Sequence, residues 1–447
     1  MTNSTSEAPP ASPSGTVGES RTKAWGFTGM LMILYTINWA DKAIYGLVAQ
    51  PLAEELDMSA SQIGLIGSLF FLAFTISGFA AGLINKWLSI RWALVLLALG
   101  WAASMLPLVV VASVAVLLVS RVVLGCFEGP SGALVHTALY SWHPLAKRGL
   151  PSACIAACGG IAKIVVAPAL VLVIAAWGWR AAFVVLAAVG VAWCVAWLLT
   201  WRPGPYGETR TDEQTPTDQT DRVEADTTRV PWRRIFLTPT FLGGAAAVFA
   251  AYSLVTVVLT WLPSYFEVGL GYSRVQAGAM FAFPSIAGMV MVFTLTSIGD
   301  RMLLRGTSSR ILRGVVPSVS LVVCGLILVA VPYIGTPAMT VAVVAIGYGF
   351  GACVFPMYNS GLSEICPPTQ LAGTLGVFLG IMASGGIIAP YLTGFIVDHA
   401  AEPAHGYALA FQVMGIVALL AGVLAMAIVN PVRDARRLLG ATASADR

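Results

Sequence analysis

The sequence predicts an all-α membrane protein with about 12 transmembrane helices arranged in two six-helix bundles. Its 447 residues are 57% hydrophobic and only 10% charged, whereas soluble domains average about 25% charged residues. Apolar stretches of about 20 residues recur along the chain, and each is long enough to cross a ~30 Å hydrocarbon core as a helix. A polar stretch near the middle of the chain separates them into two groups of six.

The predicted domains follow the alternation of apolar and polar segments. Residues 1–24 are rich in Ser, Pro and Thr and lack the apolar core of a signal peptide, so we expect a disordered cytoplasmic tail. An N-terminal bundle at 25–200 and a C-terminal bundle at 239–430 flank a polar cytoplasmic linker at 201–238. A second cytoplasmic tail covers 431–447. The predicted spans lie at 26–48, 62–85, 91–112, 113–139, 149–176, 180–200, 240–262, 276–298, 313–334, 337–358, 373–397 and 405–430.

The distribution of Lys and Arg predicts the orientation. With both termini in the cytoplasm, 20 of the 25 basic residues fall on the inner side, as the positive-inside rule requires. The first outer loop, by contrast, contains Glu54, Glu55 and Asp57. We therefore expect a multi-pass protein of the cell membrane with both termini cytoplasmic. The net charge of +4 reflects this orientation, and no nucleic-acid motif is present, so no nucleic-acid partner is expected.

Few charged residues lie well inside the apolar segments. Each of them costs about 2.5–3.5 kcal/mol at a helix centre on insertion scales, so they are expected to face one another or a watery cavity. The carboxylates so placed are Asp41 and Glu128, and the bases are Lys42, Arg121 and Lys163.

Helical spacing places several of these residues together. Asn38, Asp41, Lys42 and Tyr45 follow one stripe of the first helix, at positions i, i+3, i+4 and i+7. In the fourth helix, Arg121 and Glu128 stand two turns apart, about 10 Å along one face. In the seventh segment, Tyr252, Trp261 and Tyr265 belong either to an interface belt or to the cavity wall, and we include Tyr252 in the predicted substrate site.

Two interpretations fit this charged cluster. In the first, a static ion-pair network pins the first helix to the fourth, although buried ion pairs are weak stabilisers. In the second, the two carboxylates exchange protons with the two sides of the membrane while the bases hold an anion. Glu128 is the main proton carrier and Asp41 is the second. The cluster of two carboxylates and three bases has a net charge of +1 when both carboxylates are ionised and +3 when both are protonated. Proton binding and anion binding then strengthen each other, as symport requires.

Lys163 lies in the fifth segment within G-G-I-A-K-I-V-V-A-P, about 14 residues from either end. A lysine near a helix end can extend its ammonium group to the interface, but this central position makes that interpretation less favourable. We therefore predict that Lys163 faces the cavity and contacts a carboxylate of the substrate.

These residues resemble the major facilitator superfamily and, within it, the anion:cation symporters, which include bacterial sugar-acid permeases and vesicular glutamate and sialic acid carriers. The resemblance covers roughly residues 30–430. N-W-A-D-K (38–42) resembles the Asn-Tyr-x-Asp-Arg of the family's first helix, and R-V-V-L-G-C-F-E-G-P (121–130) resembles its fourth-helix Arg and Glu. Similar loops are W-H-P-L-A-K-R-G (142–149), W-G-W-R-A-A-F (177–183) and G-D-R-M-L-L-R-G-T-S-S-R (299–310).

The resemblance implies the major facilitator fold and proton-driven uptake of an organic anion. It also implies roles for four of the buried residues. Asp41 and Glu128 match the family's proton-coupling carboxylates, while Lys42 and Arg121 match its substrate-linked and coupling arginines.

The sequence departs from the family pattern in four respects. Lys42 replaces the usual Arg, so a point charge stands where the family has a bidentate fork. Lys163 is an additional base. Asn85 and Leu88 stand where the gating motif usually has Asp and Gly, and Gly380 stands where sugar-acid carriers often have Asn. Together these departures favour a smaller or more apolar carboxylate, including an aromatic one, over a sugar acid.

Other functions on the same fold have less support. A proton-driven exporter of drugs or organic metabolites is the main alternative, but it would favour acidic excess in the cavity, whereas here the excess is basic. No catalytic triad, metal cluster or phosphate loop lies in one soluble region, so neither an enzyme nor a cofactor or metal site is expected. The expected partners are a small organic anion, protons and the lipid bilayer, and the expected state is a monomer.

Overall fold

The computed structural model describes residues 16–144, 149–206 and 230–440, and all of its regular elements are helices. The N-terminal half contains α1 (Thr16–Leu56), α2 (Ala60–Gly78), α3 (Ala81–Trp87), α4 (Ile90–Ser104), α5 (Leu106–Val110), α6 (Val114–Glu128), α7 (Ser131–Tyr140), α8 (Gly149–Ile161), the π-helix η2 (Ala162–Val166), α9 (Ala167–Trp177) and α10 (Trp179–Thr200).

The C-terminal half has a similar make-up. It contains α11 (Trp232–Phe236), α12 (Pro239–Ser264), the π-helix η3 (Tyr265–Gly269), α13 (Arg274–Met280), α14 (Phe283–Leu304), the π-helix η4 (Ile311–Val315), α15 (Val316–Val329), the 3-10 helix η5 (Val331–Tyr333), α16 (Pro337–Ala352), α17 (Val354–Ile365), α18 (Pro368–His399), α19 (Pro403–Ile428) and α20 (Pro431–Leu439).

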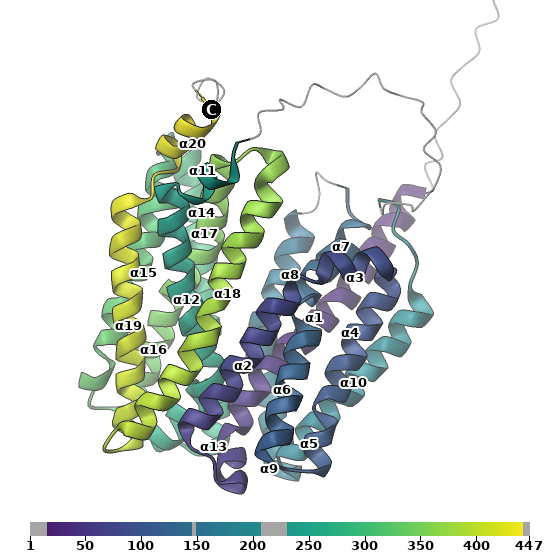
Figure 1. The fold of residues 1–447 in the computed structure, drawn as a ribbon, viewed down its shortest axis with the longest axis vertical. Helices are drawn as coiled ribbons and strands as arrows, with labels where there is room; N and C mark the ends of the chain where they lie inside the picture. The colour runs from purple at the N-terminus through teal and green to yellow at the C-terminus, as the bar shows by residue number, and fades with distance from the viewer. Residues whose placement is uncertain (1–15, 145–148, 207–229, 441–447) are drawn as a thin grey trace, which may run out of the picture.

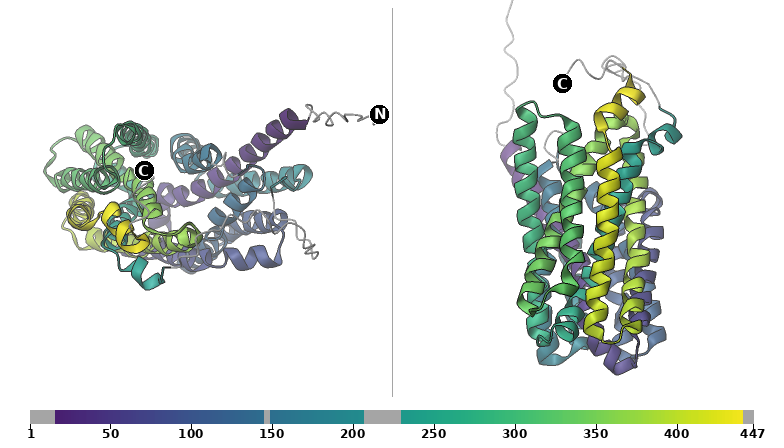
Figure 2. Two further views of the ribbon diagram at one scale, coloured as in Figure 1. Left: turned by 90° about the horizontal axis from the view of Figure 1, so that it is seen from above. Right: turned by 90° about the vertical axis from the view of Figure 1, so that its left-hand side faces the viewer.

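The two halves form two bundles that stand side by side (Figure 1). The long helices of each bundle run roughly parallel to one axis, as the two further views show (Figure 2). The start of α1 and the terminal α20 lie at the same end of the molecule (Figure 1). This end is called the terminal end below, and the opposite one is called the far end.

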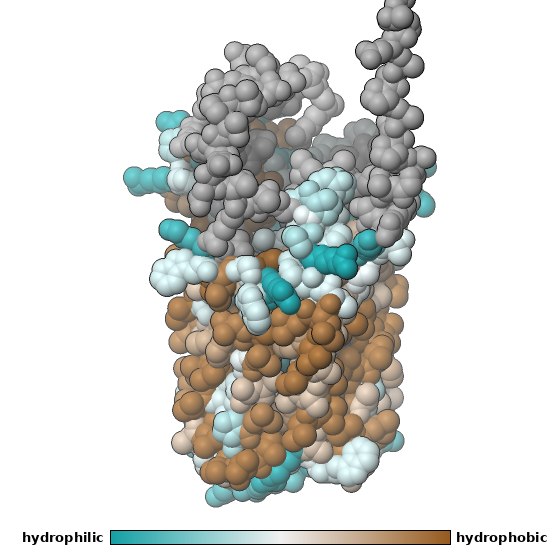
Figure 3. All heavy atoms as spheres, turned by 90° about the vertical axis from the view of Figure 1, so that its right-hand side faces the viewer, coloured by the Kyte–Doolittle hydropathy of each residue, from teal (hydrophilic) through white to brown (hydrophobic). Residues whose placement is uncertain are grey.

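Eleven helical segments of the described residues are long and apolar enough to cross a membrane. The 41-residue α1 is not among them, because Asn38, Asp41 and Lys42 lower the hydropathy of its middle. With α1 added, 11 + 1 = 12 segments agree with the predicted number. On the face formed by the N-terminal bundle, a broad apolar band lies between hydrophilic residues above and below it (Figure 3).

Three polar segments contain more helix than the sequence predicted. The helix α1 begins at Thr16, inside the expected tail 1–24, because extending a formed helix costs little. Within the linker 201–238, α11 forms where Ile235 is fully buried. Within the tail 431–447, Asn430 caps the start of α20. The remaining parts of these segments, residues 1–15, 207–229 and 441–447, lie outside the described residues, as do Lys147, Arg148 and the side chain of Asn85.

Glycines allow close contact between α2 and α6. A Cβ atom added at Gly125 would lie 2.5 Å from the carbonyl oxygen of Phe70 and 3.1 Å from the backbone nitrogen of Phe74. At this position, therefore, the backbones of the two helices approach too closely for any side chain. The Gly-rich stretch at 125–132 thus has the packing role that small residues have in other membrane helices.

We expect Gly125→Ala to lower the melting temperature in detergent, because the new methyl group must push α2 away from α6. Gly376→Ala in α18 is the matched control, since a Cβ atom there meets nothing within 4 Å. Fluorescence-detected size-exclusion after heating measures both variants. Equal melting temperatures for the two would contradict the close approach.

Candidate functional site

An ion pair between Lys42 of α1 and Glu128 of α6 lies at the centre of the N-terminal bundle. The Lys42 Nζ atom contacts Glu128 Oε2, and it also donates a hydrogen bond to Asn38 Oδ1 at 2.6 Å. Asn38, Lys42 and Glu128 are 1%, 4% and 0% exposed. Such a dry pair is stable only while both partners stay charged and close, since removing one would leave an uncompensated charge.

The guanidinium group of Arg121 is held by aromatic rings. It lies 4.4 Å from the ring centroid of Tyr45 and 4.3 Å from that of Phe70, within the range of cation–π attraction. Its Nη1 atom donates to the backbone oxygen of Asp41 at 3.3 Å. The Tyr45 hydroxyl donates to the carbonyl oxygen of Ile63 at 2.7 Å, so Tyr45 supports Arg121 and links α1 to α2.

Asp41 takes no direct part in the Lys42–Glu128 ion pair. Its carboxylate has no hydrogen bond or ion pair among the described residues, and it lines a cavity of about 10 Å³ together with Trp101 and Phe183. A cavity of this size holds about one water molecule. The structure therefore gives the two predicted proton carriers different surroundings, although the helical stripe suggested a single cluster.

Lys163 lies at the contact between the two bundles. It is 5% exposed and belongs to the π-helix η2, a type of irregularity that is frequent at functional sites. Its Nζ atom donates to the hydroxyl of Tyr348 in α16 at 3.1 Å. Among the described residues no carboxylate pairs with it. The ammonium group is therefore buried with a neutral partner only.

Trp39 connects this lysine with the ion pair. Its ring centroid lies 5.5 Å from Lys42 Nζ and 5.9 Å from Lys163 Nζ. Two buried ammonium groups thus share one indole ring, whose electron-rich face attracts cations. Trp39 and Tyr348 could not be predicted from the sequence as part of the site, because aromatic residues in membrane helices usually serve packing. The only available signals were the position of Trp39 beside Asn38 and of Tyr348 in a glycine-rich stretch.

The aromatic residues of α12 and η3 face the protein interior. Tyr252, Trp261 and Tyr265 are at most 7% exposed, so they do not form a lipid-facing belt. Tyr252 makes edge contacts with Phe71 of α2 and Phe355 of α17, with centroid distances of 6.2 and 6.5 Å. Trp261 donates its indole hydrogen to the carbonyl oxygen of Pro390 instead. Of the three, Tyr252 is the one that joins aromatic residues of both bundles.

Several polar atoms around the ion pair have no partner among the described residues. They are Glu128 Oε1, Asn38 Nδ2 and Arg121 Nε, all buried. Buried polar groups are nearly always hydrogen-bonded, so each of these atoms needs an explanation. The cluster thus retains one acceptor and two donors that a proton, a water molecule or a ligand can satisfy.

The two bundles are joined at the far end by a helix cap. Asp398, near the end of α18, accepts hydrogen bonds from the backbone nitrogens of Ala60 at 2.8 Å and Ser61 at 2.7 Å, at the start of α2. These nitrogens are among the four that a helix start leaves unsatisfied. Nearby, Arg274 Nη2 lies 3.2 Å from Glu54 Oε1 and forms a second link across the bundles. The far end is therefore closed in this structure.

Two helical bundles that enclose buried charges and are linked at one end form the architecture expected of a membrane transporter. Residues 31–360 match the model of the Major Facilitator Superfamily, and the chain belongs to this family. It is accordingly a multi-pass membrane protein of a family of transporters, not of enzymes.

The chain is similar to several curated transporters. It is 27% identical over 412 residues to the probable sulfoacetate transporter SauU of Cupriavidus necator, covering 90% of this chain and 93% of that protein. It is 24% identical to the hexuronate transporter of Bacillus subtilis, covering 90% and 94%. It is 22% identical to the D-galactonate transporter of Escherichia coli O6:H1, covering 90% and 95%.

Two solved structures share the fold. A bacterial homologue of the human lysosomal transporter Spinster, in an inward-facing and unoccupied conformation, matches with a TM-score of 0.73 at 18% identity, covering 93% of this chain and 98% of that one. A D-xylose-proton symporter matches with a TM-score of 0.73 at 14% identity, covering 92% and 99%. These likenesses confirm the predicted major facilitator fold.

Asp398→Ala should loosen the far end, because it removes both acceptors at the start of α2. A lost cap costs about 1 kcal/mol, which corresponds to roughly a fivefold shift in the population of the closed state. The shift is measured as the distance between spin labels attached at positions Val111 and Glu402. The seven native cysteines are replaced for this experiment. Glu55→Ala is the control, since Glu55 pairs with Arg180 inside one bundle. An unchanged distance distribution in the Asp398 variant would refute the role.

Proposed function

We propose that the protein takes up a small organic anion together with protons by alternating access. The observation that carries this proposal is the pair of ammonium groups on Trp39. One of them is held by Glu128, and the other has no carboxylate partner among the described residues. An organic anion as the substrate is supported by the names of three relatives: a probable sulfoacetate transporter, a hexuronate transporter and a D-galactonate transporter.

Protonation of Glu128 provides the coupling. An ionised Glu128 neutralises Lys42, so only Lys163 is available to attract an anion. When Glu128 takes up a proton, the ion pair is lost, and Lys42, still hydrogen-bonded to Asn38, becomes a second cation without a counter-charge beside Trp39. The anion then binds more tightly to the protonated protein. By reciprocity the anion also strengthens proton binding, which is the linkage that symport needs.

Release of the proton reverses these steps. Once Glu128 is exposed to the less acidic side, it ionises and recovers Lys42, and the anion loses one of its two cations. Asp41 is the second titrating group in this proposal. Its separate water-sized cavity and the neighbouring Arg121 would let it respond to the same cycle without contacting the substrate.

The closed far end corresponds to the outer side in this proposal. Both chain ends and most Lys and Arg residues belong at the cytoplasmic side by the positive-inside rule. The described conformation would then be inward-facing, with Asp398 and the Arg274–Glu54 pair closing the outer side. A monomer in the cell membrane is sufficient for this cycle, because each chain contains both bundles.

Glu128→Gln should abolish proton-driven uptake and still permit exchange of internal for external substrate, because Gln cannot titrate. The measurement is internal pH in proteoliposomes while sugar acids, aliphatic carboxylates, sulfonates and aromatic carboxylates are added outside. Glu402→Gln, at an exposed position, is the matched control and should acidify the lumen like the wild type. Loss of exchange as well, in folded Glu128→Gln protein, would count against the carrier role.

Lys163→Met should weaken anion binding, whereas Lys163→Arg should restore part of it. A hydrogen bond to a charged group contributes about 1.5–3 kcal/mol, so we expect the apparent affinity to fall by about 10- to 100-fold. Tyr348→Phe keeps the cation and removes only its hydroxyl partner, so its effect should be smaller. The apparent affinity of all three variants is measured by counterflow, with the substrate that the internal-pH assay identifies. An unchanged affinity in Lys163→Met would exclude contact with the substrate.

A further inference from the structure

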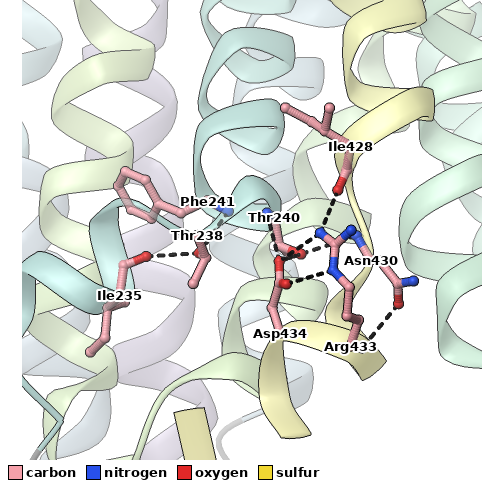
Figure 4. A network of polar contacts seen from close by, with 8 residues as sticks. All are labelled: Ile235, Thr238, Thr240, Phe241, Ile428, Asn430, Arg433 and Asp434. Atoms are coloured by element: carbon pink, nitrogen blue, oxygen red, sulfur yellow. Dashed lines mark hydrogen bonds and ion pairs between the residues drawn. The ribbon is translucent and has the colours of Figure 1, made fainter. Parts of the chain in front are cut away.

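A docked helix follows the last membrane span at the terminal end of the C-terminal bundle. Asp434 of α20 is 1% exposed and accepts hydrogen bonds from the backbone nitrogen of Thr240 at 3.0 Å and from its hydroxyl at 2.7 Å. Arg433 donates to Asp434 and, at 3.0 Å, to the carbonyl oxygen of Ile428 (Figure 4). This network fixes α20 against the start of α12. The arginines on the other faces of α20 therefore have fixed positions relative to the C-terminal bundle.

Two clefts flank α20. One has a volume of about 710 Å³ and lies between α20 and α11, with Arg233, Arg234 and Arg437 in its lining. The other has a volume of about 450 Å³ and lies between α20 and the start of η4, with Arg310, Arg433, Arg436 and Arg437 in its lining. Arg437 belongs to both clefts, so the two form one continuous basic region.

The charge in these clefts is not balanced. Six arginines and one carboxylate line them, which gives a formal charge of 6 − 1 = +5. The carboxylate is Asp434, which is already occupied by Thr240 and Arg433. Among the residues that the structure describes, the side chains of the remaining five arginines have no hydrogen bond or ion pair. Mutual repulsion between them would be relieved by bound anions.

The apolar surroundings indicate which kind of anion fits. Trp232 and Leu237 of the α11 region are 45% and 58% exposed beside Arg233 and Arg234. Exposed tryptophans are typical of the membrane–water interface. The span of α12 begins at Pro239 and that of α19 ends at Ile428, so the clefts lie at the edge of the hydrocarbon layer. An anion with an attached acyl chain would satisfy both the arginines and these apolar side chains.

We propose that the two clefts beside α20 bind phosphate groups of an anionic phospholipid of the surrounding membrane leaflet. Orientation alone requires only that basic residues lie on this side. It does not require that they converge on two clefts around a helix held by a buried carboxylate. Basic clusters that directly follow a transmembrane helix, or lie between helices at its end, are a recurrent form of lipid-headgroup site. Because the clefts share Arg437, a lipid with two phosphates can occupy both.

Native mass spectrometry of the detergent-purified full chain tests this proposal. The probes are phosphatidylglycerol, cardiolipin, the zwitterionic phosphatidylcholine and inorganic phosphate. The cleft variant carries Arg234→Gln, Arg436→Gln and Arg437→Gln. Its control carries Arg301→Gln and Arg305→Gln, two exposed arginines at the same end that line neither cleft.

We expect wild type and control to retain the two anionic lipids and the cleft variant to bind them at least about tenfold more weakly, with little retention of phosphatidylcholine. Equal retention by the cleft variant and the control would overturn the proposal. Equal binding of phosphatidylcholine would also overturn it, and so would thermal stabilisation by inorganic phosphate equal to that by the lipids. In either case the clefts would not be specific for an anionic lipid headgroup. If the triple variant elutes as an aggregate, Arg233→Gln and Arg310→Gln, which each change one cleft, replace it.

Discussion

The buried ion pair between Lys42 and Glu128 is the constraint on which the centre of the molecule depends. Neither charge could be left alone in a dry bundle, so α1 and α6 must stay in contact at this depth. Asn38 satisfies the same ammonium group, and Trp39 lies beside it, so one helical turn of α1 serves the pair. In the proposed cycle a proton on Glu128 breaks this contact, so the ion pair that links α1 to α6 would also be the group that responds to protons.

Much of the site could be predicted because charge inside a membrane is costly. On this ground the sequence indicates five residues, all of which are buried: Asp41, Lys42, Arg121, Glu128 and Lys163. The cost of a buried charge does not determine which charges pair with each other. Spacing along each helix places residues on a face, but the partner depends on how the helices are rotated against each other. This is why the separate cavity of Asp41, and the use of Tyr45 to support Arg121, were not foreseen.

The fold was predictable for a simpler reason, since about 20 apolar residues in a row have few alternatives to a membrane helix. The structure differs from the expectation in the polar segments, to which this length rule does not apply. In α11 and α20 the helix is short and charged, and it exists because it packs on the end of a bundle, through Ile235 in one case and Asp434 in the other. Contacts between the halves, such as Lys163 with Tyr348, join residues 185 positions apart, and no local pattern encodes them.

The cap that Asp398 provides has a consequence for the energetics of the conformational cycle. The start of α2 obtains two of its hydrogen bonds from the other bundle, in a region exposed to water. When the bundles separate, water can replace the carboxylate, and neither partner is left unsatisfied. The far end is therefore held by a preference of modest size and not by a lock. A coupling free energy of about 1–3 kcal/mol, typical of a ligand acting at a distance, is comparable to that preference, so in the proposed cycle ligand binding at the central site would be sufficient to shift which side is open.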